Sequence, residues 1–207
     1  MHPSTPDPQA SPQEPDCILP PSRLRRLQDL GLATVEARER STHMRITKSR
    51  RHSKIIGDFG ENLICNWLSR SGFEVTIVDH TGIDIVAYNP KTEERLGITV
   101  KSRTRDEGKE EAPVNLLDYR KGKNGRQELE DACEAFACTP WIAVYVETAE
   151  YADVYLTSVE NYDSQYRGEA GKAIDDWKMG KKYRDRYDKD PNVKCIRIQF
   201  QIGNWWE

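Results

Sequence analysis

Two charged residues stand within apolar stretches of the sequence where charges are uncommon. Asp84 interrupts the run IDIVA (83–87), and Lys101 follows the run ITV (98–100). A strand interior that apolar rarely holds an acid without a partner. Because side chains alternate along a strand, Thr99 and Lys101 share one face, and in a hairpin that face can also carry Asp84. The sequence therefore predicts that these three side chains lie together.

A third candidate, Glu61, stands about one turn into a helix that we expect to begin at Asp58. On a helical projection Glu61 falls at the border of the apolar face, from which it could point toward the same spot. Carboxylates are hard oxygen donors that hold Mg²⁺ or Mn²⁺. Such an ion lowers the pKa of a bound water and offsets charge on a phosphate, while a nearby lysine positions or deprotonates that water. These residue types suit phosphodiester hydrolysis.

Three short runs carry a resemblance to a known family: Gly57-x-x-Gly60-Glu61, Gly82-Ile83-Asp84-Ile85 and Thr99-Val100-Lys101-Ser102. Over roughly residues 54–158 the chain resembles the PD-(D/E)xK nuclease superfamily, closest to its Holliday-junction-resolvase-like and restriction-endonuclease-like branches. The resemblance implies a Mg²⁺- or Mn²⁺-dependent endonuclease acting on DNA. It implies that Asp84, Glu61 and the main-chain carbonyl of Val100 hold the metal and that Lys101 is catalytic.

One position departs from the family pattern. Two residues before the lysine the family carries Glu, Asp or sometimes Gln, and this chain carries Thr99, whose hydroxyl is a poor, uncharged ligand. Either another acid supplies the missing charge, with Glu61 as the strongest candidate and Glu110, Glu111 or Glu128 as alternatives, or the site has decayed. In the second case the fold is a module that binds nucleic acid or protein without cutting.

Purely structural explanations also exist for the candidate residues. Asp84 and Lys101 could form a buried ion pair within the sheet, although such pairs stabilise a fold only weakly. Glu61 could be an acid near a helix N-terminus, where the helix dipole favours negative charge. Both alternatives stay open on the sequence alone.

The elements that must position these residues follow from hydrophobic periodicity and from the turn residues between periodic segments. We expect the α/β class, with a restriction-endonuclease-like α-β-β-β-α-β core whose central mixed sheet is flanked by helices. The expected helices cover 58–71, 126–138 and about 169–180; the expected strands cover 73–79, 82–89, 95–102, 141–147, 152–159 and 193–203; and 103–125 reads as a long polar loop.

Composition divides the chain into four parts. Residues 1–21 hold seven of the eleven prolines, which predicts a disordered tail. Residues 22–53 read as a helical and basic arm, 54–159 as the nuclease-like core, and 160–207 as a C-terminal extension with a final strand.

Basic residues gather in three places that could contact nucleic acid, in spite of a formal net charge of −3. A solvated linker or loop would explain the same runs. The candidates are Arg50, Arg51, Lys54, Ser102, Arg103, Arg105, Arg120, Lys121 and Lys123. DNA is the expected partner, and a homodimer is possible.

Cysteine usage and hydropathy bear on localisation. The five cysteines form no CxxC pair, and irregular spacing favours reduced thiols in a reducing compartment. The sequence shows no basic-then-apolar signal pattern and no run of 18 apolar residues. We therefore expect a cytoplasmic or nucleoid-associated protein that is neither secreted nor embedded in a membrane.

Overall fold

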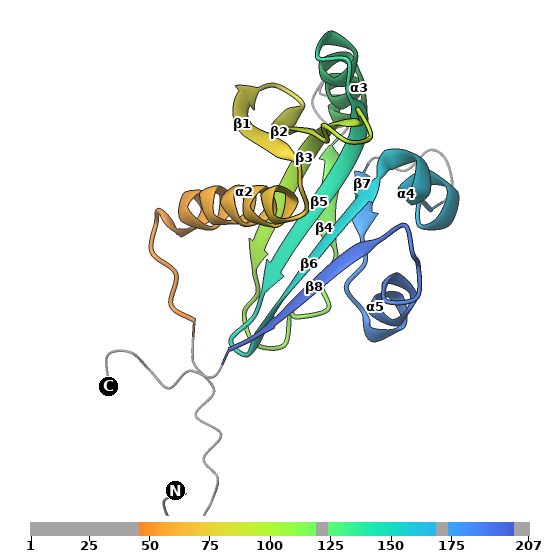
Figure 1. The fold of residues 1–207 in the computed structure, drawn as a ribbon. Coiled ribbons are helices and arrows are strands. Elements are labelled where there is room, and N and C mark those ends of the chain that lie inside the picture. The colour runs from red at the N-terminus through yellow and green to blue at the C-terminus, as the bar shows by residue number, and fades with distance from the viewer. Residues whose placement is uncertain (1–45, 119–123, 169–173, 201–207) are drawn as a thin grey trace, which may run out of the picture. The chain divides into compact units, whose positions relative to one another are not determined.

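The computed structural model describes residues 46–118, 124–168 and 174–200, all within the compact unit Thr42–Glu207 (Figure 1). The predicted tail, most of the predicted helical and basic arm over 22–53 and the residues 119–123 lie outside the described residues. In chain order the elements are α2 (His52–Arg70), β1 (Glu74–His80), β2 (Ile83–Tyr88), β3 (Arg95–Thr104), β4 (Val114–Asp118), α3 (Gly125–Ala135), β5 (Thr139–Glu147), β6 (Tyr151–Ser158), α4 (Val159–Gln165), β7 (Ile174–Trp177), α5 (Lys181–Tyr187) and β8 (Lys194–Gln199).

A central mixed sheet holds six of these strands in the order β1-β2-β3-β5-β6-β8. The neighbours pair antiparallel except β3 and β5, which run parallel over Leu96–Thr104 and Thr139–Glu147. The crossover between those two strands contains α3, as a parallel connection requires. The expected α/β class, with a mixed sheet flanked by helices, is confirmed, and β8 is an integral strand of the sheet.

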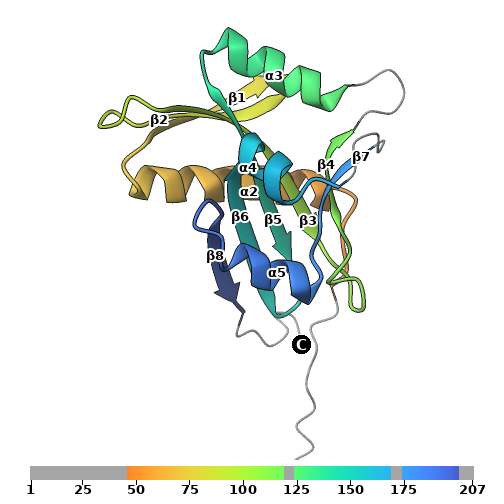
Figure 2. The same cartoon turned by 90° about the vertical axis from the view of Figure 1, so that its right-hand side faces the viewer.

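Buried residues form two clusters, one on each face of the sheet. Ile64 and Ile98 belong to the cluster under α2. Leu129, Val144 and Trp177 belong to the cluster between the sheet and the elements α3, α4, β7 and α5. Figures 1 and 2 show α2 on one side of the sheet and α4, β7 and α5 on the other. The two faces therefore carry different covers, and the candidate residues divide between them.

Helix α2 begins six residues earlier than the sequence predicted. Its first residue is His52, and Asp58 lies exposed within the helix instead of capping it. Burial of Ile56 extends the stripe formed by Gly60, Ile64 and Leu68, so the preceding turns gain packing and the helix continues back past Asp58. The C-terminal end was predicted correctly, because Gly72 takes the left-handed φ of +91° that ends many helices.

Strands β4 and β7 form a second, two-stranded sheet, and the predictions for both of these segments were wrong. The segment expected to be a loop, 103–125, contains β4, and the segment expected to be a helix around 169–180 contains β7. These strands pair antiparallel with each other, and Val114 and Trp177, which lie opposite, are both buried. Each strand is too short to show its own periodicity, and its partner lies some 60 residues away in the sequence. Their pairing is therefore a tertiary effect.

No helix within the described ranges is long and apolar enough to span a membrane. The cysteines within those ranges, Cys65, Cys133, Cys138 and Cys195, carry free thiols. Cys133 is buried, and Gly97 allows its sulfur to approach β3, because a Cβ at that glycine would meet the sulfur at 2.6 Å.

Candidate functional site

The candidate site lies where β2 and β3 separate. The backbone pairing of these strands ends at the Ile85–Ile98 pair. At the next residue of β2, Asp84, the side chain and not the backbone bonds to β3. The Oδ2 atom of Asp84 accepts a hydrogen bond of 2.6 Å from the amide of Val100. The amide and carbonyl of one strand residue point to the same side. The Val100 carbonyl therefore also faces the gap that β2 leaves.

Thr99 links Asp84 to Lys101. The Nζ of Lys101 donates to the Thr99 hydroxyl oxygen at 2.8 Å, and that hydroxyl donates to Oδ2 of Asp84 at 3.3 Å. Among the described residues, Asp84 and Lys101 form no direct ion pair; the hydroxyl stands between them. Burial lowers the pKa of Lys101, and the charge of Asp84 only partly opposes this effect. The structure therefore brings the three side chains together as predicted. Asp84 and Lys101 are joined through Thr99 and do not form a simple buried ion pair.

Glu61 approaches the same residues from α2. Gly60 lets the helix lie close to β3, because a Cβ there would run into the Ser102 hydroxyl. Burial raises the pKa of the Glu61 carboxyl, and the charge of Asp84 raises it further, while the charge of Lys101 acts in the opposite sense. Glu61 therefore lies within electrostatic reach of Asp84 and Lys101, although it does not line the cleft that these two residues share.

A cleft of about 470 Å³ opens over Asp84 and Lys101. Strands β2 and β3 form one side, and β4 and the first turns of α3 form the other. The cleft is lined by Gly82, Asp84, Thr99, Lys101, Arg103, Asn115, Leu116, Leu117, Gly125 and Glu128. Of the three acids considered as substitutes for the missing carboxylate at position 99, Glu128 lines the cleft, and Glu110 and Glu111 do not. Sequence reasoning missed Asn115, because its short strand read as loop.

Three residues predicted to contact nucleic acid, Ser102, Arg103 and Arg105, lie in different surroundings. Arg103 lines the cleft and donates to the Ser102 carbonyl at 2.7 Å. Ser102 is buried on the α2 side of the sheet, so the structure does not bring its side chain to the cleft. Arg105 donates to the carbonyls of Ala112 and Pro113, both at 2.8 Å, which ties it to the loop before β4. Arg103 is therefore the member of this group best placed for a ligand.

The basic residues before and within α2 lie near the end of β3. Lys48 donates to the Thr104 carbonyl at 2.9 Å, and His52 bonds the Thr104 hydroxyl at 2.7 Å, which fixes this segment against the strand. Arg50 and Arg51 are exposed, whereas Lys54 pairs with Asp58 at 3.0 Å. The predicted contacts at Arg120, Lys121 and Lys123 lie outside the described residues.

The donor set fits a small divalent cation. Asp84 and Glu61 would supply carboxylate oxygen and Val100 a carbonyl oxygen, the hard ligands that Mg²⁺ and Mn²⁺ prefer. Within the described residues no three side chains of His, Cys, Asp or Glu are gathered closely enough to enclose a metal. Mg²⁺ usually keeps several waters and binds through one or two carboxylates, so an open site of this kind suits it.

Comparison with solved structures finds similarity to Hjc, a Holliday junction resolvase from the hyperthermophilic archaeon Archaeoglobus fulgidus. The TM-score is 0.43 and the sequence identity 19%, and the match covers 63% of this chain and 88% of the resolvase chain. No protein-family model matches the chain, and a search of curated proteins finds no match either. What this chain does must therefore be inferred from the geometry of its own cleft.

Proposed function

We propose that this chain is a metal-dependent endonuclease that hydrolyses phosphodiester bonds in DNA. The observation that carries the proposal is the cleft lined by Asp84 and Lys101, which are joined through Thr99, and by Arg103. A carboxylate and two cations in one polar cleft suit a phosphate that is bound together with a divalent ion. The sequence resemblance to the PD-(D/E)xK nucleases points the same way.

Each residue has a part that follows from its position. Asp84 has one oxygen committed to Val100 and Thr99 and keeps the other for a cation. A Mg²⁺ or Mn²⁺ ion held by Asp84 would supply a more acidic water and would offset charge that develops on the phosphate. Lys101, held by Thr99, presents an amine that orients the attacking water and can accept its proton, a task that the lowered pKa favours. Arg103 steadies the phosphate through its guanidinium group.

A second candidate function is supported by Thr99. A neutral residue at this position leaves the site with one carboxylate fewer than the family pattern, so the fold would bind nucleic acid or protein without cutting. In that case Asp84 would still be held by the Val100 amide, because this hydrogen bond needs no metal. Binding without cleavage in the presence of metal is the outcome that favours this candidate.

The decisive experiment is a cleavage assay on branched, duplex and single-stranded DNA and on RNA. Each substrate is incubated with the full chain in Mg²⁺, in Mn²⁺ and in excess chelator, and binding is measured in parallel by gel shift in Ca²⁺. We expect cleavage of at least one DNA substrate that needs the divalent ion. Binding without cleavage on every substrate would support the second candidate, and neither binding nor cleavage would contradict both.

A further inference from the structure

Glu128 lines the cleft from helix α3. It stands in the first turns of α3, whose N-terminus is capped by the side chain of Asn124, an acceptor for the Gln127 amide at 3.2 Å. The Glu128 amide in turn donates to the Asn124 carbonyl at 2.9 Å. This capping holds the turn in place, and the half-buried Glu128 side chain lines the cleft that contains Asp84 and Lys101.

Gly82 allows the backbone at Glu128 to lie close to the segment that carries Asp84. Gly82 has a φ of +101°, and a Cβ at this position would collide with the main-chain carbonyl of Glu128. The backbone of α3 at Glu128 therefore rests directly on the residue two before Asp84. Only glycine accommodates both the left-handed conformation and this contact without strain. The two carboxylates are thus carried by backbone segments in direct contact.

Among the residues that the structure describes, the Glu128 carboxylate has no partner outside the cleft. Within the described residues its side chain forms no hydrogen bond and no ion pair, whereas its neighbour Gln127 bonds Asp131 at 2.7 Å. The other two candidate acids lie outside the cleft lining: Glu110 accepts from the Gly108 amide at 2.8 Å, and the Glu111 carboxylate lies beside Gly180. A helix-dipole role would explain an acid in this turn, but it does not require a half-buried side chain in the cleft.

Building on the proposed function, we propose that Glu128 supplies the metal-binding carboxylate that Thr99 cannot. The Thr99 hydroxyl positions the side chains of Asp84 and Lys101 through its two hydrogen bonds. The second negative charge at the metal site comes from Glu128 of α3 instead of from residue 99 of β3. The metal would then be held between β2 and α3, with Asp84 on one side and Glu128 on the other. The contact between Gly82 and the backbone of Glu128 would set how far apart the two carboxylates lie.

The test measures Mn²⁺ binding to the full chain by calorimetry, with no nucleic acid present. Glu128→Gln should weaken Mn²⁺ binding by roughly tenfold or more, because affinity at oxygen-ligand sites follows the number of charged ligands. The matched control is Glu130→Gln, an exposed acid of the same helix, which should leave the affinity unchanged. Thermal melting without metal completes the set, since a helix-dipole role would lower the melting temperature of Glu128→Gln even then.

A second variant separates this inference from the proposed function. If Glu128 does the work of the absent acid, then adding Thr99→Glu to the Glu128→Gln chain should restore much of the Mn²⁺ affinity. Wild-type binding that Asp84→Asn abolishes and Glu128→Gln leaves intact would overturn the role of Glu128 while the proposed function stands. No Mn²⁺ binding by the wild-type chain at millimolar concentration would overturn both.

Discussion

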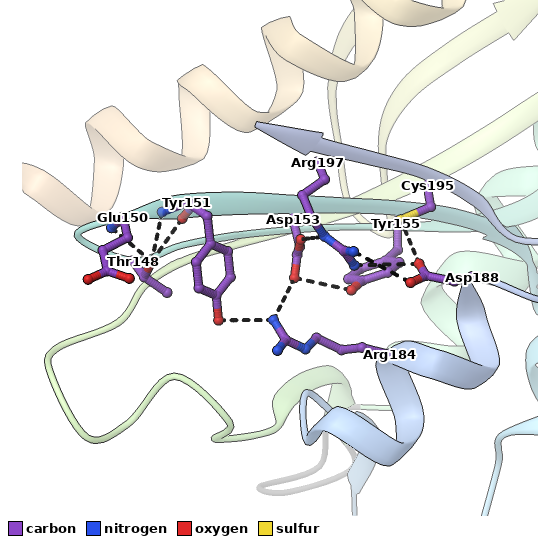
Figure 3. A network of polar contacts seen from close by, with 9 residues as sticks. All are labelled: Thr148, Glu150, Tyr151, Asp153, Tyr155, Arg184, Asp188, Cys195 and Arg197. Carbon is purple, nitrogen blue, oxygen red and sulfur yellow. Dashed lines mark hydrogen bonds and ion pairs between the residues drawn. The ribbon is translucent and has the colours of Figure 1, made fainter. Parts of the chain in front are cut away.

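Two aspartates in the central sheet have similar sequence surroundings and different fates. Asp84 in β2 and Asp153 in β6 are each flanked by apolar residues. Asp153 is fully buried and accepts hydrogen bonds from Arg197 Nε at 2.7 Å and from Arg184 Nη1 at 3.3 Å (Figure 3). The Tyr155 hydroxyl donates to it at 3.3 Å as well. Both carboxylate oxygens of Asp153 are therefore occupied by side chains of this chain.

Within the described part of the chain, Asp84 is bonded through one oxygen only, to the Val100 amide and the Thr99 hydroxyl, and Lys101 bonds Thr99 instead of Asp84. Asp84 lines a cleft where its carboxylate can bind a ligand. Asp153 instead forms ion pairs with Arg184 of α5 and Arg197 of β8, which connect these two elements to β6. The difference teaches that a carboxylate in an apolar strand does not by itself mark a functional site. What marks a functional site is a carboxylate whose charge is only partly compensated by hydrogen bonds and ion pairs within the protein.

The sharpest way to break this comparison is to neutralise Asp84. Asp84→Asn should lower cleavage by roughly a hundredfold or more, because the main ligand for the ion loses its charge. The free energy of unfolding should change by less than about 1 kcal/mol, because the asparagine amide oxygen can still accept from the Val100 amide. Activity and urea denaturation are measured on the same preparation. Parent-like cleavage by this variant would remove Asp84 from the site.

Asp153→Asn should behave in the opposite way. We expect a loss of about 2 kcal/mol or more in the free energy of unfolding, because Arg184 and Arg197 lose a fully buried charged acceptor. The loss should stay moderate, since the two arginine side chains are 25% and 40% exposed and can reach water. Urea denaturation gives the value. A variant as stable as the parent would show that this network contributes nothing net.

The basic residues at the start of α2 and the lysines of α5 should also differ in their contribution to DNA binding. Neutralising Arg50, Arg51 and Lys54 together should flatten the slope of log affinity against log salt by roughly two units, about one per lost phosphate contact. We expect fewer than three units because Lys54 already pairs with Asp58. The matched control neutralises Lys181, Lys182 and Lys189, exposed residues in and just after α5, and should leave the slope unchanged. Equal slopes for both triple variants would place the α2 arm away from the nucleic acid.

The smallest expected effect concerns Glu61. Its carboxyl pKa is raised by burial first and by the charge of Asp84 second, so Asp84→Asn should move that pKa down toward its ordinary value. Burial persists in the variant, so part of the rise should remain. The pKa is read by NMR titration of the side-chain carboxyl in the metal-free chain, with Asp153→Asn as the control. An unchanged Glu61 pKa would mean that the helix α2 carries no group in contact with the site.

Local patterns were sufficient for the central elements. The alternation around Asp84 and around Lys101 placed both strands and the shared face of Thr99 and Lys101 correctly, because the two-residue period belongs to the strand backbone itself. The start of α2 was misplaced by six residues, since Asp58 looks like a cap in the sequence and only the burial of Ile56 extends the helix past it. Strands β4 and β7 were missed because neither shows its own periodicity.

The sequence by itself determined which residues could do chemistry and that three of them share a strand face, because side-chain alternation depends on neighbours in the chain. Only the tertiary structure decided which acid reaches them. Glu110, Glu111 and Glu128 are equivalent in the sequence, and the packing of α3 against Gly82 brings Glu128 alone of the three to the cleft. That choice depends on contacts between segments some 45 residues apart, which side-chain volume and backbone fit settle and no local pattern records.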